Sequence, residues 1–156
     1  MTVSNVFYNH LLGKPCQPYA SDMKVKIDRK YFYPDVMVDC SQVDADYYIE
    51  QPSIIVKVLS KSTRQHDKTV KRLAYFQIAS LKEYFLIDYD FVEIEFWSRD
   101  ENNYWQQSVY YLGDDMTFQS IELTVSVEDI YRQVKNADML AWWEREKTET
   151  DQPVIE

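Results

Sequence analysis

Three residues in the first half of the chain have the types and surroundings that metal-dependent chemistry requires. Asp35 follows Pro34 and opens an apolar run, Lys57 interrupts a second apolar run, and Lys71 lies in a stretch with helical periodicity. A hard divalent cation binds carboxylates, carbonyl oxygens and water, and a nearby lysine can orient an attacking water or stabilise developing phosphate charge. The sequence supplies part of such a site, because only one convincing carboxylate, Asp35, can be identified.

Lys57 is the anomaly in this candidate site. In the run 54–60, both odd and even positions are apolar up to Leu59 except for Lys57. This pattern predicts a strand covered on both faces. An ammonium among apolar neighbours costs several kcal/mol unless it is paired, and Asp35 is the natural partner. We therefore expect the Lys57 ammonium to occupy the place of a metal ion, pair with Asp35, and leave the site unable to activate water.

Other polar residues have simpler interpretations. Asp39 shares a strand face with Asp35 but lies roughly 13 Å further along, so we expect a strand-end acid. Lys71 has two open interpretations: a solvated residue paired with Asp67 four positions earlier, or a member of the site. His10 and His66 are expected at the surface.

The composition of the 156-residue chain bounds its class. With 46% hydrophobic and 28% charged residues it reads as one globular domain, and it lacks a 20-residue apolar run or signal peptide, so we expect a cytoplasmic protein without a membrane partner. Cys16 and Cys40 show no metal-type spacing and are expected as buried free thiols in a reducing compartment. The net charge of −9 disfavours a general nucleic-acid coat protein.

The order of periodic segments predicts the architecture. Helices are expected at 3–12, 64–79, 127–134 and 137–146, and strands at 17–27, 34–40, 52–60, 83–88, 92–97, 103–111 and 121–125. In the second helix the apolar positions Val70, Leu73, Ala74, Ile78 and Leu81 should face the sheet. This order predicts an α/β (α+β) domain over 1–135 with a mixed central sheet flanked by helices, followed by a C-terminal helix and acidic tail over 136–156.

A series of motifs runs through the chain in a characteristic order. They are Gly13-Lys14-Pro15-Cys16, Ser21-Asp22-Met23-Lys24-Val25, Tyr33-Pro34-Asp35-Val36-Met37-Val38, Val58-Leu59-Ser60-Lys61-Ser62-Thr63, the trio Asp67, Lys71 and Tyr75, and Ser80-Leu81-Lys82-Glu83-Tyr84. Over roughly 3–131 the chain resembles the Uma-type restriction endonucleases of the PD-(D/E)XK nuclease superfamily. The resemblance implies a restriction-endonuclease-like fold and Mg²⁺- or Mn²⁺-dependent hydrolysis of DNA.

The chain departs from the family pattern at the metal site. The resemblance implies a metal held by Asp35 and by a glutamate on the next core strand, but where similar members read Glu-Val-Leu-Ser this chain reads Lys57-Val58-Leu59-Ser60. In the literal (D/E)-X-K register Lys57 is the lysine and Ile55 takes the acid position. The helical lysine of the family matches Lys71. Members also carry some tens of residues before the first helix, including a glutamate, so either the start is miscalled or the domain is truncated.

Two functions compete on these residues. In the first, an endonuclease with impaired hydrolysis uses Asp35, Lys57 and Lys71 as its catalytic set and Asp35 as metal ligand, and contacts DNA through Lys61, Arg64, Lys68 and Arg72. In the second, a non-catalytic interaction or dimerisation module keeps the fold, with a Lys57–Asp35 ion pair in place of the metal. We favour an impaired endonuclease-family protein that forms a homodimer.

Overall fold

The computed structural model describes residues 2–43 and 47–151. The helical elements are α1 (Thr2–Leu11), α2 (Arg64–His66), the π-helix η1 (Asp67–Lys71), α3 (Arg72–Phe76), the 3₁₀-helix η2 (Gln119–Ile121), α4 (Val127–Ile130) and α5 (Ala137–Asp151). The strands are β1 (Gln17–Ala20), β2 (Lys24–Ile27), β3 (Lys30–Phe32), β4 (Val36–Asp39), β5 (Tyr48–Ile49), β6 (Pro52–Leu59), β7 (Glu83–Asp88), β8 (Ile94–Arg99), β9 (Trp105–Tyr110), β10 (Asp115–Phe118) and β11 (Leu123–Ser126).

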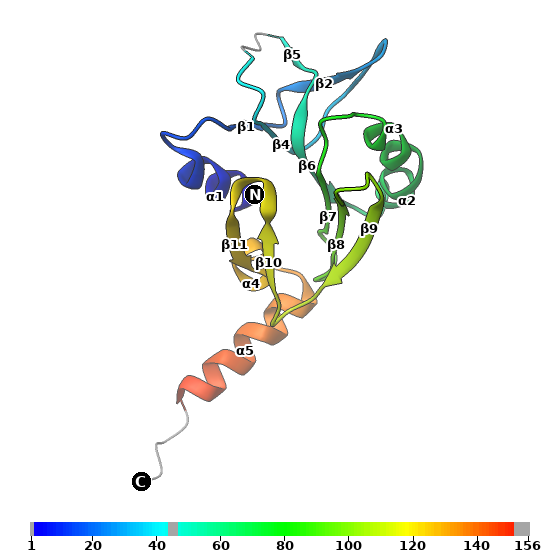
Figure 1. The fold of residues 1–156 in the computed structure, drawn as a ribbon. Coiled ribbons are helices and arrows are strands. Elements are labelled where there is room, and N and C mark those ends of the chain that lie inside the picture. The colour runs from blue at the N-terminus through cyan, green and yellow to red at the C-terminus, as the bar shows by residue number, and fades with distance from the viewer. Residues whose placement is uncertain (1, 44–46, 152–156) are drawn as a thin grey trace.

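A six-stranded mixed sheet forms the centre of the molecule, in the order β1-β4-β6-β7-β8-β9 (Figure 1). β6 and β7 are parallel, and the other neighbouring pairs are antiparallel. The segment α2–η1–α3 connects the two parallel strands, as a crossover between buried strands requires. The predicted mixed sheet flanked by helices is confirmed.

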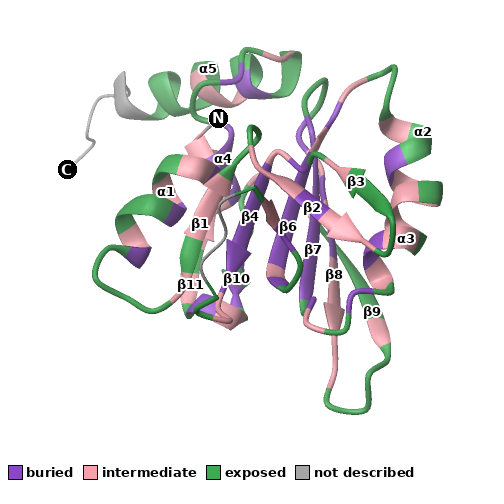
Figure 2. Ribbon diagram, turned by 90° about the horizontal axis from the view of Figure 1, so that it is seen from above, coloured by how far each residue is buried: buried purple, intermediate pink, exposed green. Residues whose placement is uncertain are grey.

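Strand alternation divides the core into two layers, one on each face of this sheet. On β4, Val36 and Val38 join the layer that α1 covers with Phe7, whereas Met37 joins the layer that α3 covers with Tyr75. All six residues of β7 are buried, which agrees with helices or loops on both faces. Figure 2 shows this buried centre in β4, β6 and β7. The sheet therefore holds the residues before β4 and within β6 in fixed positions.

Two short sheets complete the fold and differ from the predicted strands. The expected strand at 17–27 is two strands, because the chain turns after Ala20 and β2 leaves the central sheet to pair with β3 and β5. β10 was not predicted, although Met116 and Phe118 are buried and alternate with exposed residues. Four residues are too few for a period of two to stand out in the sequence.

The predicted regular helix at 64–79 is wrong in its periodicity. A π-helical turn replaces the α-helix between Asp67 and Lys71, and helix α3 ends at Phe76. Val70 and Leu73 are each 59% exposed, whereas Asp67 and Tyr75 are fully buried. A π-turn contains more residues than an α-turn, so it rotates the residues around it away from the 3.6-residue period on which the prediction depends.

The prediction of two free thiols is also wrong. Cys16 and Cys40 form a disulfide, with their Cα atoms 4.1 Å apart. Cys16 directly precedes β1 and Cys40 directly follows β4, and the pairing of Gln17 with Asp39 brings them opposite each other. Pairing across strands, rather than spacing along the chain, brings the sulfurs together. The expectation of a cytoplasmic location loses the support that it took from reduced cysteines, and it stays a prediction.

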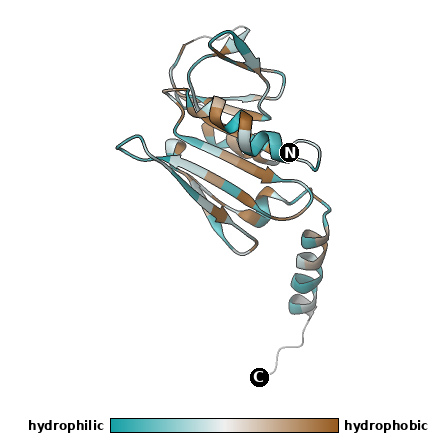
Figure 3. Cartoon of the chain, turned by 90° about the vertical axis from the view of Figure 1, so that its right-hand side faces the viewer, coloured by the Kyte–Doolittle hydropathy of each residue, from teal (hydrophilic) through white to brown (hydrophobic). Residues whose placement is uncertain are grey.

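The C-terminal helix α5 extends away from the body of the domain (Figures 1 and 3). Met139 near its start is fully buried, and Trp142 and Trp143 pack partly against the core layer that includes Phe7. The helix begins close to the predicted boundary at 136, and the two-part division stays a prediction. Within 2–43 and 47–151, no helix is long and apolar enough to cross a membrane.

Candidate active site at the ends of β4 and β6

Two hydrogen bonds to the backbone of β6 hold Asp35 in position. The antiparallel register pairs Val36 with Val56, so Asp35 lies beside the carboxyl-terminal half of β6. Its backbone N–H donates to the Val56 carbonyl at 3.1 Å, and its Oδ2 accepts the Val58 N–H at 2.6 Å. A carboxylate that accepts a short backbone hydrogen bond has little freedom to turn, so its position is determined by the sheet.

Lys57 forms the ion pair that its sequence context predicts. Its Nζ lies 3.4 Å from Asp35 Oδ2 and 3.4 Å from the Tyr33 carbonyl oxygen, to which it donates. Lys57 is only 8% exposed. Both contacts are longer than an optimal charge-assisted hydrogen bond. The ammonium is therefore removed from most water and is neutralised by Asp35 through a loose contact.

A second ion pair lies on the neighbouring helical segment. Lys71 Nζ is 3.2 Å from Asp67 Oδ1, across the π-turn, so the pairing with Asp67 is confirmed, and a role of Lys71 in catalysis stays a prediction. Asp67 is completely buried, and among the described residues no hydrogen bond reaches either of its carboxylate oxygens. Lys71 thus supplies the main compensation for a buried negative charge. Sequence reasoning identified both residues but not the burial of the carboxylate.

Tyr75 connects the two ion pairs electrostatically. Burial raises the pKa of its hydroxyl, and the negative charges of Asp67 and then Asp35 raise it further. The hydroxyl is buried without a hydrogen-bond partner in the part of the chain that the structure describes. Tyr75 is part of the motif series given above, but its sequence neighbours carry no sign that two carboxylates would act on its hydroxyl.

The donor groups do not fit a divalent metal ion. Asp35 is a single carboxylate whose Oδ2 is already engaged by Val58 and Lys57. Asp39 is buried at the far end of β4 and accepts the Ser41 N–H at 2.7 Å, as expected of a strand-end acid. Over 2–43 and 47–151, no three His, Cys, Asp or Glu residues gather where they could hold a metal. We therefore derive no reaction step through Mg²⁺ or Mn²⁺.

A small pocket of about 200 Å³ opens beside Asp35. Its walls include Val3 and Ser4 of α1, Ser21 after β1, and Val56 and Val58 of β6. These residues add two hydroxyl groups and apolar surface to Asp35, and none of them is a second acid. The pocket therefore does not provide the second carboxylate that the family pattern places on β6.

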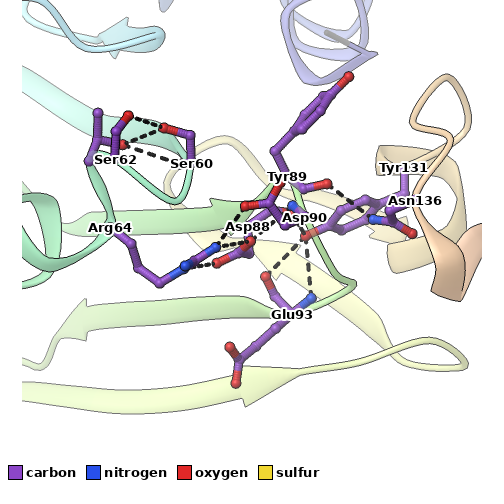
Figure 4. A network of polar contacts seen from close by, with 10 residues as sticks. Ser60, Ser62, Arg64, Asp88, Tyr89, Asp90, Glu93, Tyr131 and Asn136 are labelled. Carbon is purple, nitrogen blue, oxygen red and sulfur yellow. Dashed lines mark hydrogen bonds and ion pairs between the residues drawn. The ribbon is translucent and has the colours of Figure 1, made fainter.

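The structure separates the four predicted DNA contacts into two groups. Lys61 is exposed and Lys68 partly exposed. Arg64 instead donates to the Asp88 carboxylate at 2.6 and 2.9 Å and lies 3.0 Å from Asp90 Oδ2 (Figure 4), and its hydrogen bonds to Asp88 raise the pKa of the guanidinium. The Arg72 guanidinium lies 4.5 Å from the Trp97 ring centroid. Both arginines therefore have contacts within the chain, Arg64 through ion pairs and Arg72 through a cation–π contact.

Asp88 is also the centre of a network that the sequence did not indicate. The Tyr131 hydroxyl lies 2.5 Å from the Asp88 carbonyl and 3.0 Å from the Glu93 carbonyl, and Asn136 donates to the Tyr89 carbonyl at 3.2 Å (Figure 4). These contacts attach the segment after α4 to the turn between β7 and β8. The only available sign was an acidic residue at the end of a buried strand.

Comparison with known proteins identifies the family. The sequence pattern of Uma2, described as "Putative restriction endonuclease", matches residues 2–128. The chain belongs to the Uma2 family. The uncharacterized protein slr1290 of Synechocystis sp. is 34% identical to it over 134 residues, which cover 83% of this chain and 70% of that relative. The uncharacterized protein sll1609 of the same organism is 34% identical over 93 residues, covering 56% of this chain and 52% of its own length.

A solved structure supports the fold of this Uma2 protein. The crystal structure of a putative nuclease belonging to DUF820 from Anabaena variabilis superposes with a TM-score of 0.69, covering 83% of this chain and 76% of the other. The sequences are 13% identical, so the likeness concerns the fold alone. Together, the family and the architecture confirm the predicted restriction-endonuclease-like class.

Proposed function

We propose that this Uma2 protein keeps a nuclease fold but does not hydrolyse DNA by itself, because the Lys57–Asp35 ion pair takes the place of a metal. The observation that carries the proposal is the buried Lys57 ammonium, 3.4 Å from the Asp35 carboxylate. An ammonium neutralises Asp35 but has no vacant coordination position, so it cannot lower the pKa of a bound water as a divalent ion does.

The surrounding charges support this proposal. The ion pairs Lys57–Asp35 and Lys71–Asp67 are each neutral, so the site has no excess negative charge to attract a divalent cation. Lys57 would also repel such a cation from Asp35 at close range. The positive and negative charges of the site therefore balance without a metal ion.

The arrangement of basic side chains favours an interaction role over a DNA-processing one. Six cations cluster in sequence near the site, but four of them are engaged within the chain and only two are left to meet a polyanion. The engaged residues are Lys57, Arg64, Lys71 and Arg72, and the remaining ones are Lys61 and Lys68. With a net charge of −9, such a surface attracts DNA weakly.

The test compares the natural chain with Lys57→Glu and with the matched control Lys57→Gln. Lys57→Glu restores the second carboxylate, whereas Lys57→Gln removes the ammonium without adding an acid. We expect Mn²⁺ to raise the melting temperature of Lys57→Glu in a saturable way and to leave the natural chain and Lys57→Gln unchanged. Nicking of supercoiled plasmid DNA, measured in the same buffers, reports hydrolysis.

The decisive result concerns the natural chain. If it nicks plasmid DNA with Mg²⁺ or Mn²⁺ and Asp35→Ala abolishes the nicking, the proposal is wrong and a different residue replaces the missing carboxylate. If Lys57→Glu binds Mn²⁺ but does not nick DNA, metal binding has been restored without the remaining catalytic machinery, which also agrees with a non-hydrolytic role.

A further inference from the structure

Strand β9 forms an open edge of the central sheet. It is the last strand in the sheet order, and within 2–43 and 47–151 no strand pairs with its outer side. Its central residues Gln106, Gln107, Ser108 and Val109 are all exposed (Figure 2). An edge of this kind presents unpaired backbone N–H and C=O groups that can accept a further strand.

The edge lacks the features with which proteins usually block strand addition. The nine residues from Tyr104 to Leu112 contain no charged residue and no proline, in a chain of which 28% is charged. The pairing of β9 with β8 runs without a bulge over six residue pairs. Charges, prolines and bulges are the common protections of sheet edges, so β9 is an unprotected edge.

The opposite edge of the same sheet shows the contrast. Strand β1 has only four residues and contains Pro18, which cannot donate a backbone hydrogen bond to a new neighbour. The disulfide between Cys16 and Cys40 also ties the start of this strand to β4. One edge of the sheet is therefore closed to strand addition and the other is open.

We propose that β9 is a dimerisation edge, at which the β9 strands of two copies pair antiparallel and join the two sheets. A second copy fits this strand because β9 carries no charge, so two chains of net charge −9 repel each other least where their β9 edges meet. This inference rests on the proposed interaction role, because it names the partner in that interaction. A two-fold axis lets the edge strands of both copies form the same backbone hydrogen bonds.

The ends of the strand are suited to this arrangement. Tyr104 and Tyr111 flank β9 and are 70% and 52% exposed. A two-fold axis through Gln107 or Ser108 brings the start of one strand beside the end of the other, with Trp105 of one copy opposite Val109 or Tyr111 of the other. Aromatic and β-branched cross-strand pairs are among the more stabilising ones. Because the contact is only six residues long, we expect a weak, concentration-dependent dimer.

The test is sedimentation velocity over a wide range of protein concentrations, without metal. The variant Gln107→Lys/Val109→Lys places like charges across the two-fold axis in either register. It should keep the fold, because both positions are exposed and Glu95, which Gln107 contacts at 2.6 Å, can accept from an ammonium there. The control Gln17→Lys/Ala20→Lys makes the same change in charge at exposed positions on β1.

We expect the natural chain and the β1 control to shift from the mass of one chain to that of two as concentration rises, and the β9 variant to stay at one. A natural chain that stays monomeric overturns the inference, as does a β1 control that loses the dimer like the β9 variant. Hydrogen exchange of the Trp105–Tyr110 amides should slow with concentration in the natural chain, which tests the interface without a variant. These readouts are independent of DNA hydrolysis, so this inference and the proposed function can fail separately.

Discussion

At the scale of single residues, the interior of this protein contains polar groups that have hydrogen-bond or ion-pair partners and polar groups that have none among the described residues. The Tyr131 hydroxyl contacts two backbone carbonyls, whereas the Tyr75 hydroxyl is buried with no partner among the described residues. The Lys57 ammonium and the Asp35 carboxylate depend on each other, because each would otherwise be a poorly compensated charge in the sheet. Side chains of the same type therefore differ in what their removal would do.

The two tyrosines provide a matched comparison. Tyr75→Phe removes an unsatisfied buried hydroxyl without changing shape, so we expect it to leave the free energy of unfolding unchanged or to raise it by about 1 kcal/mol. Tyr131→Phe removes the hydrogen bonds from its hydroxyl to the Asp88 and Glu93 carbonyls, and we expect a loss of about 1–3 kcal/mol. Urea denaturation of both variants measures the difference. Equal losses in the two variants would mean that the Tyr75 hydroxyl has a partner after all.

The Lys57–Asp35 pair can be tested by a double-mutant cycle in urea. Asp35→Ala leaves a buried ammonium, so we expect it to cost about 1–3 kcal/mol, a value below that of a fully buried pair because the Asp35 side chain is 36% exposed. In the combination with Lys57→Met the two losses should be less than additive by about 1 kcal/mol. Strict additivity would show that the two side chains do not stabilise each other.

At the scale of elements, the irregular features determine how the site is built. The π-turn from Asp67 to Lys71 buries a carboxylate and aligns it with its lysine, and in doing so leaves Val70 and Leu73 in solvent. The disulfide holds the short strand β1 against β4, the strand that begins directly after Asp35. Both features follow from how elements meet, and neither follows from the propensity of a single segment.

The altered helix periodicity can be measured with two leucines. Leu73 is 59% exposed, although the apolar period of a regular helix would turn it toward the sheet, whereas Leu81, beyond the end of α3, is fully buried. We expect Leu73→Ala to change the free energy of unfolding by less than about 0.5 kcal/mol, and Leu81→Ala, the buried control beyond the end of α3, to lower it by about 2–5 kcal/mol. A large loss of stability from Leu73→Ala would mean that Leu73 is buried against the sheet, as a regular helix requires.

The disulfide should contribute measurably to stability. Its closure links residues 24 positions apart, and a loop of that length corresponds to roughly 3 kcal/mol of stabilisation. We expect Cys16→Ser/Cys40→Ser to lower the free energy of unfolding by about this amount. Reductant should destabilise the natural chain to a similar degree and leave the double variant unchanged, whereas insensitivity of the natural chain would indicate free thiols.

At the scale of the whole molecule, buried tyrosines couple folding to pH. Burial raises the pKa of Tyr75, Tyr84 and Tyr131 above the ordinary value of 10.0, because the charged phenolate is poorly solvated inside the protein. Nearby carboxylates contribute in the same direction at all three. In each case the folded protein retains a proton that the unfolded chain releases first.

This coupling predicts alkaline destabilisation. A raised folded-state pKa gives stability that is complete below the unfolded value near pH 10 and that decreases as the pH rises above it. We expect the midpoint of urea unfolding to be steady up to about pH 9 and to fall steeply above about pH 10. Tyr75→Phe should make this fall less steep, and the part of the tyrosinate absorbance that comes from Tyr75, Tyr84 and Tyr131 should appear together with unfolding. Tyrosinate absorbance of all tyrosines before unfolding would contradict the prediction.

The sequence by itself determined the features that depend on local chemistry and short-range pattern. Alternation and apolar runs predicted β4, β6 and β7 and the mixed sheet, because a strand buried on one or both faces must carry that pattern. The same reasoning predicted the Lys57–Asp35 pair, since a lysine in a doubly covered strand requires a partner and few candidates lie near.

Only the tertiary structure decided the features that depend on contacts between distant segments. The disulfide, the partners of Arg64 and the network around Asp88 join residues between 24 and 47 positions apart, and the order of residues along the chain carries no signal for such meetings. The π-turn belongs to the same class, because the burial of Asp67 and Tyr75 against the sheet overrides the apolar period of the helix. The open edge at β9 likewise became visible only when the strand order was known.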